Sequence, residues 1–178
     1  PGAKNMVLKV IFDENGKIFG AQAVGEAGVD KRIDVIATAI KGNLTVYDLP
    51  EIEITYAPPF NSAKDPVNIA GYAAENILKG DLEMVNYDEF WDFVKENDAV
   101  ILDVRTSKEF SGGAIEGAIN INVDDLRANL ENLDKNKVYA IYCQVGLRGY
   151  LANRIMRNNG FRAVNLNGGY NLWSKVQS

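Results

Sequence analysis

The 178-residue sequence has 19 basic and 24 acidic side chains, a formal net charge of −5, and no histidine. The acidic balance argues against a nucleic-acid surface, and the lack of histidine excludes Ser-His-Asp and Cys-His catalysis and most zinc or non-haem iron sites within this chain. The sequence has one cysteine, Cys143, so it can form no internal disulfide and no Cys-x-x-Cys pair. We expect a cytoplasmic protein without a membrane segment, because no apolar run is long enough to span a bilayer and no signal segment opens the sequence.

The first half of the sequence predicts a small α+β domain. Turn residues separate two β-prone segments, which is typical of a hairpin, and Asp65-Pro66 is a strong helix start because a carboxylate can cap the helix ahead of a proline at its first position. The expected elements are hairpin strands at Val7–Phe12 and Ile18–Val24, a helix capped by Asp30 and running to Ile40, a strand at Ile52–Tyr56, and a helix from Asp65-Pro66 to about Lys79. A domain boundary is expected near Gly80–Val85.

Apolar strands alternate with helices in the second half, which predicts an α/β domain with a parallel sheet covered by helices on both faces. The expected elements are a short helix around Phe90–Val94 with an Asn86–Glu89 capping box, a strand at Ala99–Val104, a helix near Ser107–Phe110, a segment at Ala114–Ile121, a helix around Asp124–Leu130, a strand at Val138–Tyr142, a helix at Leu147–Asn158, a strand at Ala163–Leu166, and a final helix opened by Gly168-Gly169.

Cys143 directly follows the strand Val138–Tyr142, and ligands of open parallel sheets bind beyond the carboxyl ends of the strands. The loop that follows can aim successive backbone N–H groups at one point, and Gly146 permits its tight curvature. Such a loop, backed by a helix N-terminus, stabilises an anion such as a thiolate or persulfide, and Arg148 could close the ring and bind an oxyanion of a donor. The predicted active loop comprises Cys143, Gln144, Val145, Gly146, Leu147 and Arg148.

The Cys-x-x-Gly-x-Arg loop resembles the active loop of rhodanese-like domains. Further segments resemble signatures of the same family over about residues 84–178: Asp103-Val-Arg105 with Phe110, Gly113–Asn120, and Gly168-Gly169 with Trp173. The resemblance implies that Cys143 attacks a sulfur donor, becomes a persulfide and passes the sulfur to an acceptor thiol. Asp103 is expected to have a structural role near the site, and Arg105 to approach the active loop. Ala114 stands where many members have histidine.

Three other functions are weighed against sulfur transfer. Phosphatases and arsenate reductases of a related fold use a Cys-x5-Arg loop, whereas only four residues separate Cys143 from Arg148 here, and a shorter ring suits a sulfur atom better than a phosphate. A rhodanese fold can also serve as a catalytically silent interaction or regulatory module. Cys143 can alternatively act mainly as a redox-sensing thiol without turnover. Taken by itself, a lone cysteine after an apolar strand is often only a small buried residue, but the Cys-x-x-Gly-x-Arg spacing at a strand-to-helix junction favours a functional role.

The segment Thr55–Asn68, with its Tyr-Ala-Pro-Pro run, resembles the dimerisation domain of flavin-dependent pyridine nucleotide–disulfide oxidoreductases, in the branch of coenzyme A-disulfide reductase and NADH oxidase. The resemblance implies an incomplete dimerisation domain at residues 1–80 fused to a rhodanese domain at 81–178. It also implies a longer homodimeric parent that uses FAD and NAD(P)H to reduce coenzyme A disulfide, coenzyme A persulfide or polysulfide, with Tyr56 near the partner's flavin. No Gly-x-Gly-x-x-Gly fingerprint is present, so this chain alone is expected to bind no flavin.

Overall fold

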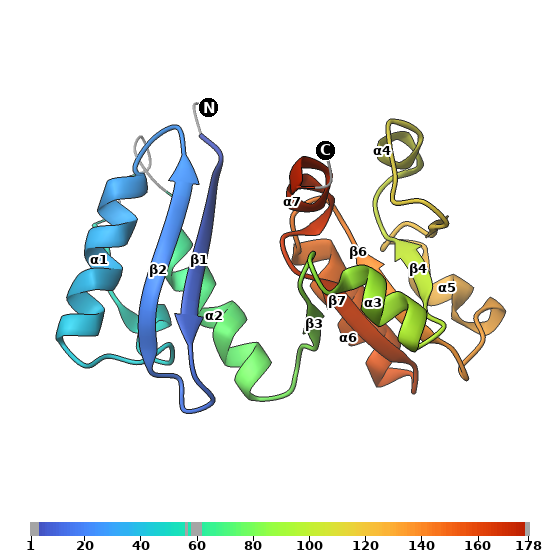
Figure 1. The fold of residues 1–178 in the computed structure, drawn as a ribbon, viewed down its shortest axis with the longest axis horizontal. Coiled ribbons are helices and arrows are strands. Elements are labelled where there is room, and N and C mark those ends of the chain that lie inside the picture. Colours follow the sequence, from blue (N-terminus) through green and yellow to red (C-terminus); the bar gives the residue numbers. More distant parts are fainter. Residues whose placement is uncertain (1–3, 56, 58–61, 177–178) are drawn as a thin grey trace. The chain divides into compact units, whose positions relative to one another are not determined.

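The computed structural model describes residues 4–55, 57 and 62–176. The chain divides into two compact units, Pro1–Gly80 and Asp81–Ser178, and Figure 1 shows the elements of each.

The first unit is a β-hairpin with two helices. Strands β1 (Met6–Phe12) and β2 (Ile18–Gly25) pair antiparallel, and side chains along β1 alternate between half-buried and exposed, as expected for a sheet with one covered face. Helix α1 (Val29–Lys41) lies along the hairpin in Figure 1, followed by a 3-10 turn, η1 (Leu49–Glu51), and helix α2 (Pro66–Leu78). The core of this unit is formed by Ile18, Ile36, Ala39, Val46, Leu49, Val67 and Ala74.

Helix α2 begins where the sequence predicts. The buried Asp65 side chain accepts a hydrogen bond from the N–H of Val67, and the N–H of Asp65 donates to the Asn68 side chain, which completes a capping box. Arg32 of α1 holds the same carboxylate at 2.7 Å. The cap therefore also ties α2 to α1.

Two predictions for the first unit are wrong. Residues 52–55 of the predicted strand Ile52–Tyr56 form no strand. The carbonyl of Ile52 accepts a hydrogen bond from the Asn68 side chain rather than from a neighbouring strand. Asp30 does not cap α1, because the N-cap is Gly28, two residues earlier and in the left-handed conformation, and Asp30 lies in the first turn of the helix. An acidic residue in the first turn still stabilises the helix, because its negative charge interacts favourably with the helix dipole.

The second unit contains a five-stranded sheet in the order β3-β7-β6-β4-β5, with every neighbouring pair parallel. This confirms the predicted α/β class. Its strands are β3 (Met84–Val85), β4 (Val100–Asp103), β5 (Ile119–Asn120), β6 (Val138–Tyr142) and β7 (Arg162–Leu166). Its helices are α3 (Phe90–Glu96), α4 (Ser107–Ser111), α5 (Leu126–Asn129) with the 3-10 turn η2 (Leu130–Asn132), α6 (Leu147–Asn158) and α7 (Gly169–Val176).

The sheet separates two hydrophobic cores, which confirms that helices cover both of its faces. Successive residues of a strand point to opposite faces. Tyr139, Ile141 and Cys143 accordingly lie in the core that includes residues of α5 and α6, whereas Ala140 and Tyr142 lie in the core that includes residues of α3. Strand β6 is central and buried on both faces, which explains its unbroken apolar sequence. The pleat therefore directs the Cys143 side chain toward the α6 face.

Helix α3 begins at Phe90 without a side-chain cap, so the predicted Asn86–Glu89 capping box is wrong. The two side chains do bond each other, but they belong to a turn in which the Glu89 N–H donates to the Asn86 carbonyl. A capping box instead opens α4, where Thr106 and Glu109 exchange hydrogen bonds. The helix predicted around Asp124–Leu130 is shorter, as α5, and continues as the turn η2.

Candidate active site

Cys143 is the residue that directly follows the central strand β6, and only 1% of its surface is exposed. Its Sγ accepts a hydrogen bond from the backbone N–H of Gly146 at 3.1 Å. Gly146 is the N-cap of the twelve-residue helix α6, and its φ of 133° is one that other residues rarely adopt. The sulfur therefore lies at the positive end of a helix, where a negative charge is stabilised.

The residues on either side of Gly146 are apolar and face outward. Val145 is 64% and Leu147 is 67% exposed. The rim of the loop is thus formed in part by hydrocarbon side chains, while the sulfur itself is buried beneath it.

Helix α7 fixes the other side of the loop. The N–H groups of Tyr170 and Asn171 donate to the carbonyls of Cys143 and Gln144 at 2.8 and 2.9 Å. Gly169 has a φ of +60°, and a Cβ at this position would lie 2.6 Å from the Cys143 carbonyl oxygen. Gly169 is therefore required for the close approach of α7 to the loop.

We expect Gly169→Ala to lower the free energy of unfolding of the second unit by about 1–3 kcal/mol, because the added methyl group overpacks against backbone that cannot rotate away. Denaturant unfolding followed by tryptophan fluorescence measures this, since both tryptophans, Trp91 and Trp173, lie in the second unit. The control is Gly160→Ala, where φ is +82° but nothing lies within 4 Å of the added Cβ. Equal losses in the two variants would contradict the steric role of Gly169.

Asp103 and Arg105 form a buried ion pair at the end of β4. Their side chains are 0% and 2% exposed, and Arg105 Nη2 lies 2.7 Å from Asp103 Oδ2. Asp103 also accepts the backbone N–H of Arg105, and the Asn120 side chain bonds the carbonyls of both residues. Burial acts to lower the pKa of Arg105, but the hydrogen bonds and charge of Asp103 outweigh it and raise the pKa above its usual value.

Arg105 reaches the active loop through Gln144. Its Nη1 donates to Gln144 Oε1 at 3.1 Å, and its Nη2 donates to the Gly113 carbonyl at 2.7 Å. The guanidinium also lies 4.1 Å from the centre of the Tyr170 ring, within the range of a cation–π contact. A single buried arginine thus connects β4, the Cys143 loop and α7.

Arg148, the last residue of the predicted loop, is bound by Glu109 of α4. Arg148 Nη2 lies 2.7 Å from Glu109 Oε1, and Nη1 lies 2.8 Å from Oε2. The hydrogen bonds from Arg148 are the largest cause that lowers the pKa of Glu109, to about 2, and Thr106 adds to the effect. In this structure the guanidinium that was expected to bind a donor oxyanion is engaged by a carboxylate.

The structure brings together most of the residues that the sequence indicated. Cys143, Gln144 and Gly146 form the loop, and Arg105 and Asp103 adjoin it. Tyr56 lies outside the described residues. Sequence reasoning missed Glu109, Tyr170 and Gly113 as site residues. The Thr106-x-x-Glu109 spacing signals the helix cap, but nothing in it indicates the bond to Arg148.

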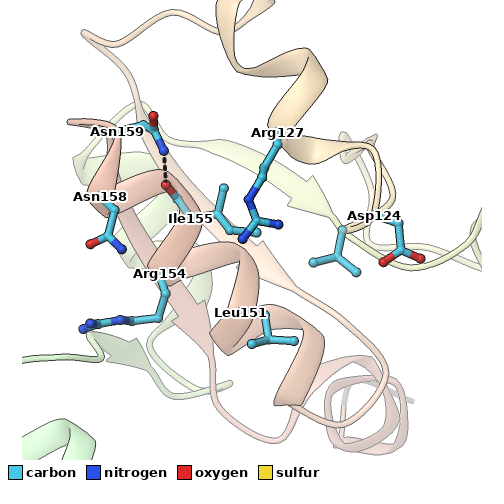
Figure 2. Close-up of a pocket in the computed structure, with 8 residues that line it drawn as sticks. Asp124, Arg127, Leu151, Arg154, Ile155, Asn158 and Asn159 are labelled. Carbon is cyan, nitrogen blue, oxygen red and sulfur yellow. Dashed lines mark hydrogen bonds between the residues drawn. The ribbon is translucent and has the colours of Figure 1, made fainter.

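The cavity on the α6 side of the second unit lies away from the sulfur. It has a volume of about 320 Å³, and Figure 2 shows Arg127 on one side of it and Leu151, Arg154 and Ile155 of α6 on the other. Arg154 bonds to Asp81, and Cys143 does not line the cavity. The sulfur site is therefore formed by the loop itself rather than by this cavity.

In the described part of the chain, no three side chains of His, Cys, Asp or Glu gather closely enough to hold a metal ion. Nor does any helix within those residues have the length and apolar character needed to cross a membrane.

Two protein families match this chain. The rhodanese-like domain family matches residues 86–176, and the dimerisation domain of pyridine nucleotide-disulphide oxidoreductases matches residues 1–66. Among curated proteins, the coenzyme A disulfide reductase of Staphylococcus haemolyticus (strain JCSC1435) is 47% identical over 78 residues, which are 43% of this chain and 18% of that protein. That of Staphylococcus aureus (strain bovine RF122 / ET3-1) is 47% identical over 76 residues, covering 42% of this chain and 17% of that protein.

Two solved structures cover nearly the whole chain. Reduced Bacillus anthracis CoADR-RHD is 49% identical, with a TM-score of 0.95 over 99% of this chain and 32% of that one. An NAD-dependent persulfide reductase from A. fulgidus is 36% identical, with a TM-score of 0.86 over 97% of this chain and 31% of that one. This chain thus spans about a third of these structures and less than a fifth of the curated relatives.

Proposed function

We propose that this chain, which belongs to the rhodanese-like domain family, transfers sulfane sulfur through a persulfide on Cys143. The observation that carries the proposal is the position of Sγ at the N-terminus of α6, with the Gly146 N–H directed at it. This environment stabilises the two anions that sulfur transfer requires at one place, a thiolate before loading and a persulfide after it.

The reaction has two displacements at sulfur. The Cys143 thiolate attacks the outer sulfur of a donor, the S–S bond of the donor breaks, and its electron pair leaves with the donor remnant. An acceptor thiolate then attacks the outer sulfur of the Cys143 persulfide, so that the S–S bond to Cys143 breaks and the thiolate is restored. No oxidant or reductant is consumed, because one S–S bond forms for each that breaks.

Sulfur transfer fits the loop better than phosphate transfer does. A phosphoryl group would need a free guanidinium, whereas Arg148 is held by both of its outer nitrogens to Glu109. The burial of Cys143 also limits access to a narrow reactant, such as the terminal sulfur of a donor.

The proposal extends to a longer protein of which this chain would be one part. The relatives named as coenzyme A disulfide reductase and persulfide reductase support a homodimeric parent that reduces coenzyme A disulfide, coenzyme A persulfide or polysulfide with FAD and NAD(P)H. Cys143 would relay sulfur to or from the flavin site of this parent. We expect other parts of the parent to hold the flavin and nicotinamide cofactors, since this chain has no Gly-x-Gly-x-x-Gly fingerprint. The reducing cytoplasm would suit this thiol chemistry.

A catalytically silent module is the second candidate, and the burial of Cys143 is the observation that favours it. A measurement of catalytic turnover distinguishes sulfur transfer from the silent module. We expect the 178-residue chain to form thiocyanate from cyanide with thiosulfate or 2-hydroxyethyl persulfide as donor, at a rate above that without protein. No increase with either donor would favour the silent module, while oxidation of Cys143 without turnover would favour a sensing thiol.

A further inference from the structure

We propose that Glu109 sets the donor preference of the Cys143 site by neutralising Arg148, so that the site favours organic persulfides of low charge over the thiosulfate dianion. This inference rests on the proposed function and names its substrate class. It assigns to Glu109 a positioning role that acts through Arg148.

The first observation is the geometry of the pair. Both terminal guanidinium nitrogens of Arg148 are bonded to Glu109, at 2.7 and 2.8 Å, although the two side chains are about a third exposed, at 31% and 32%. Thr106 also holds the carboxylate, with its backbone N–H and its hydroxyl donating to Oε2 at 3.0 and 2.8 Å. A carboxylate held in this way competes directly with a donor oxyanion for the guanidinium.

The second observation concerns the other arginine at the loop. The Arg105 guanidinium donates to Gln144, but three of its hydrogen bonds go to Asp103, which is completely buried. Each arginine in contact with the loop is thus matched by its own carboxylate. A dianion that approaches Cys143 meets two neutralised pairs rather than two free cations.

The third observation is the apolar rim of the loop. Val145 and Leu147 expose about two thirds of their surfaces on either side of Gly146. Such side chains gain from contact with the carbon chain of an organic persulfide, whereas a thiosulfate ion that settles there loses hydration without compensation.

The two loading reactions differ in the charge brought to the site. With thiosulfate, the Cys143 thiolate attacks the outer sulfur, the S–S bond breaks, and the electron pair leaves on sulfite as a dianion. With a persulfide RS–SH, attack on the outer sulfur breaks the S–S bond and releases the thiolate RS⁻. The first reaction needs a cation at the loop for both donor and leaving group, and the second does not.

The test is Glu109→Gln in the 178-residue chain, with loading rates measured for thiosulfate and for 2-hydroxyethyl persulfide. Glutamine also completes a capping box, so α4 keeps its start, and the glutamine amide carries no charge to neutralise Arg148. We expect the ratio of kcat/KM for thiosulfate to that for the persulfide to rise about tenfold, through a lower KM for thiosulfate. Adding Arg148→Met to Glu109→Gln should remove the gain.

Glu131→Gln is the matched control. It removes one exposed carboxylate from η2, which precedes the amino end of β6, whereas Cys143 follows the carboxyl end. Its donor ratio should equal that of the unchanged chain. An unchanged ratio in Glu109→Gln, or a gain that survives Arg148→Met, would overturn this inference alone. An unchanged chain that takes sulfur from neither donor would overturn the proposed function and this inference with it.

Discussion

The variant Asp103→Ala should lower the free energy of unfolding of the second unit by about 3–5 kcal/mol. The physical reason is the guanidinium that it leaves behind. Arg105 is 2% exposed and cannot move its charge into water without unpacking from Tyr170 and the Gly113 carbonyl. A buried charge that loses its partner costs far more than an exposed one.

The fluorescence of Trp91 and Trp173 during denaturant unfolding measures this effect in the second unit alone. The control is Asp98→Ala, which breaks the ion pair with Lys137 at a site where Asp98 is 87% exposed. We expect a much smaller loss there, because water and salt screen an exposed ion pair. A loss of that small size for Asp103→Ala would show that the buried pair does not hold β4, the Cys143 loop and α7 together.

The second large effect is on turnover. Cys143→Ser should reduce sulfur transfer by about a thousandfold or more, because a serine hydroxyl is not ionised at neutral pH and the chain has no second thiol to replace it. The rate of thiocyanate formation measures the loss. Unfolding by tryptophan fluorescence serves as the control and should change little, because sulfur and oxygen differ by a small volume in one buried side chain. A variant that retains the activity of the unchanged chain would remove Cys143 from the mechanism.

Sequence patterns within a short segment correctly predicted the helices and strands that depend mainly on that segment. Asp65-Pro66 gave the start of α2 because a cap depends on residues three apart, and the apolar run of β6 placed Cys143 at the carboxyl end of a central strand. The strand expected at Ile52–Tyr56 is wrong over residues 52–55 because a strand requires a neighbour, and the backbone of Ile52 bonds instead to Asn68, sixteen residues later in the chain. The sequence of a segment does not determine which distant group its backbone will bond.

The same distinction holds at the candidate site. The spacing of Cys143, Gly146 and Arg148 indicated the loop, but Arg148 meets Glu109 across 39 residues of sequence, and only the fold brings α4 to α6. The bonds from α7 to the loop carbonyls are equally distant in sequence, since Tyr170 lies 27 residues after Cys143. The role of each site residue, and the assignment of the two domains to their functions, remain predictions.

Intact-protein mass spectrometry of the 178-residue chain, after incubation with thiosulfate or 2-hydroxyethyl persulfide and removal of the donor, tests the central claim most directly. We predict a gain of one sulfur atom that cyanide or a thiol acceptor removes, and no gain in Cys143→Ser. A chain that gains no sulfur from either donor, or that gains it equally in Cys143→Ser, would contradict the account.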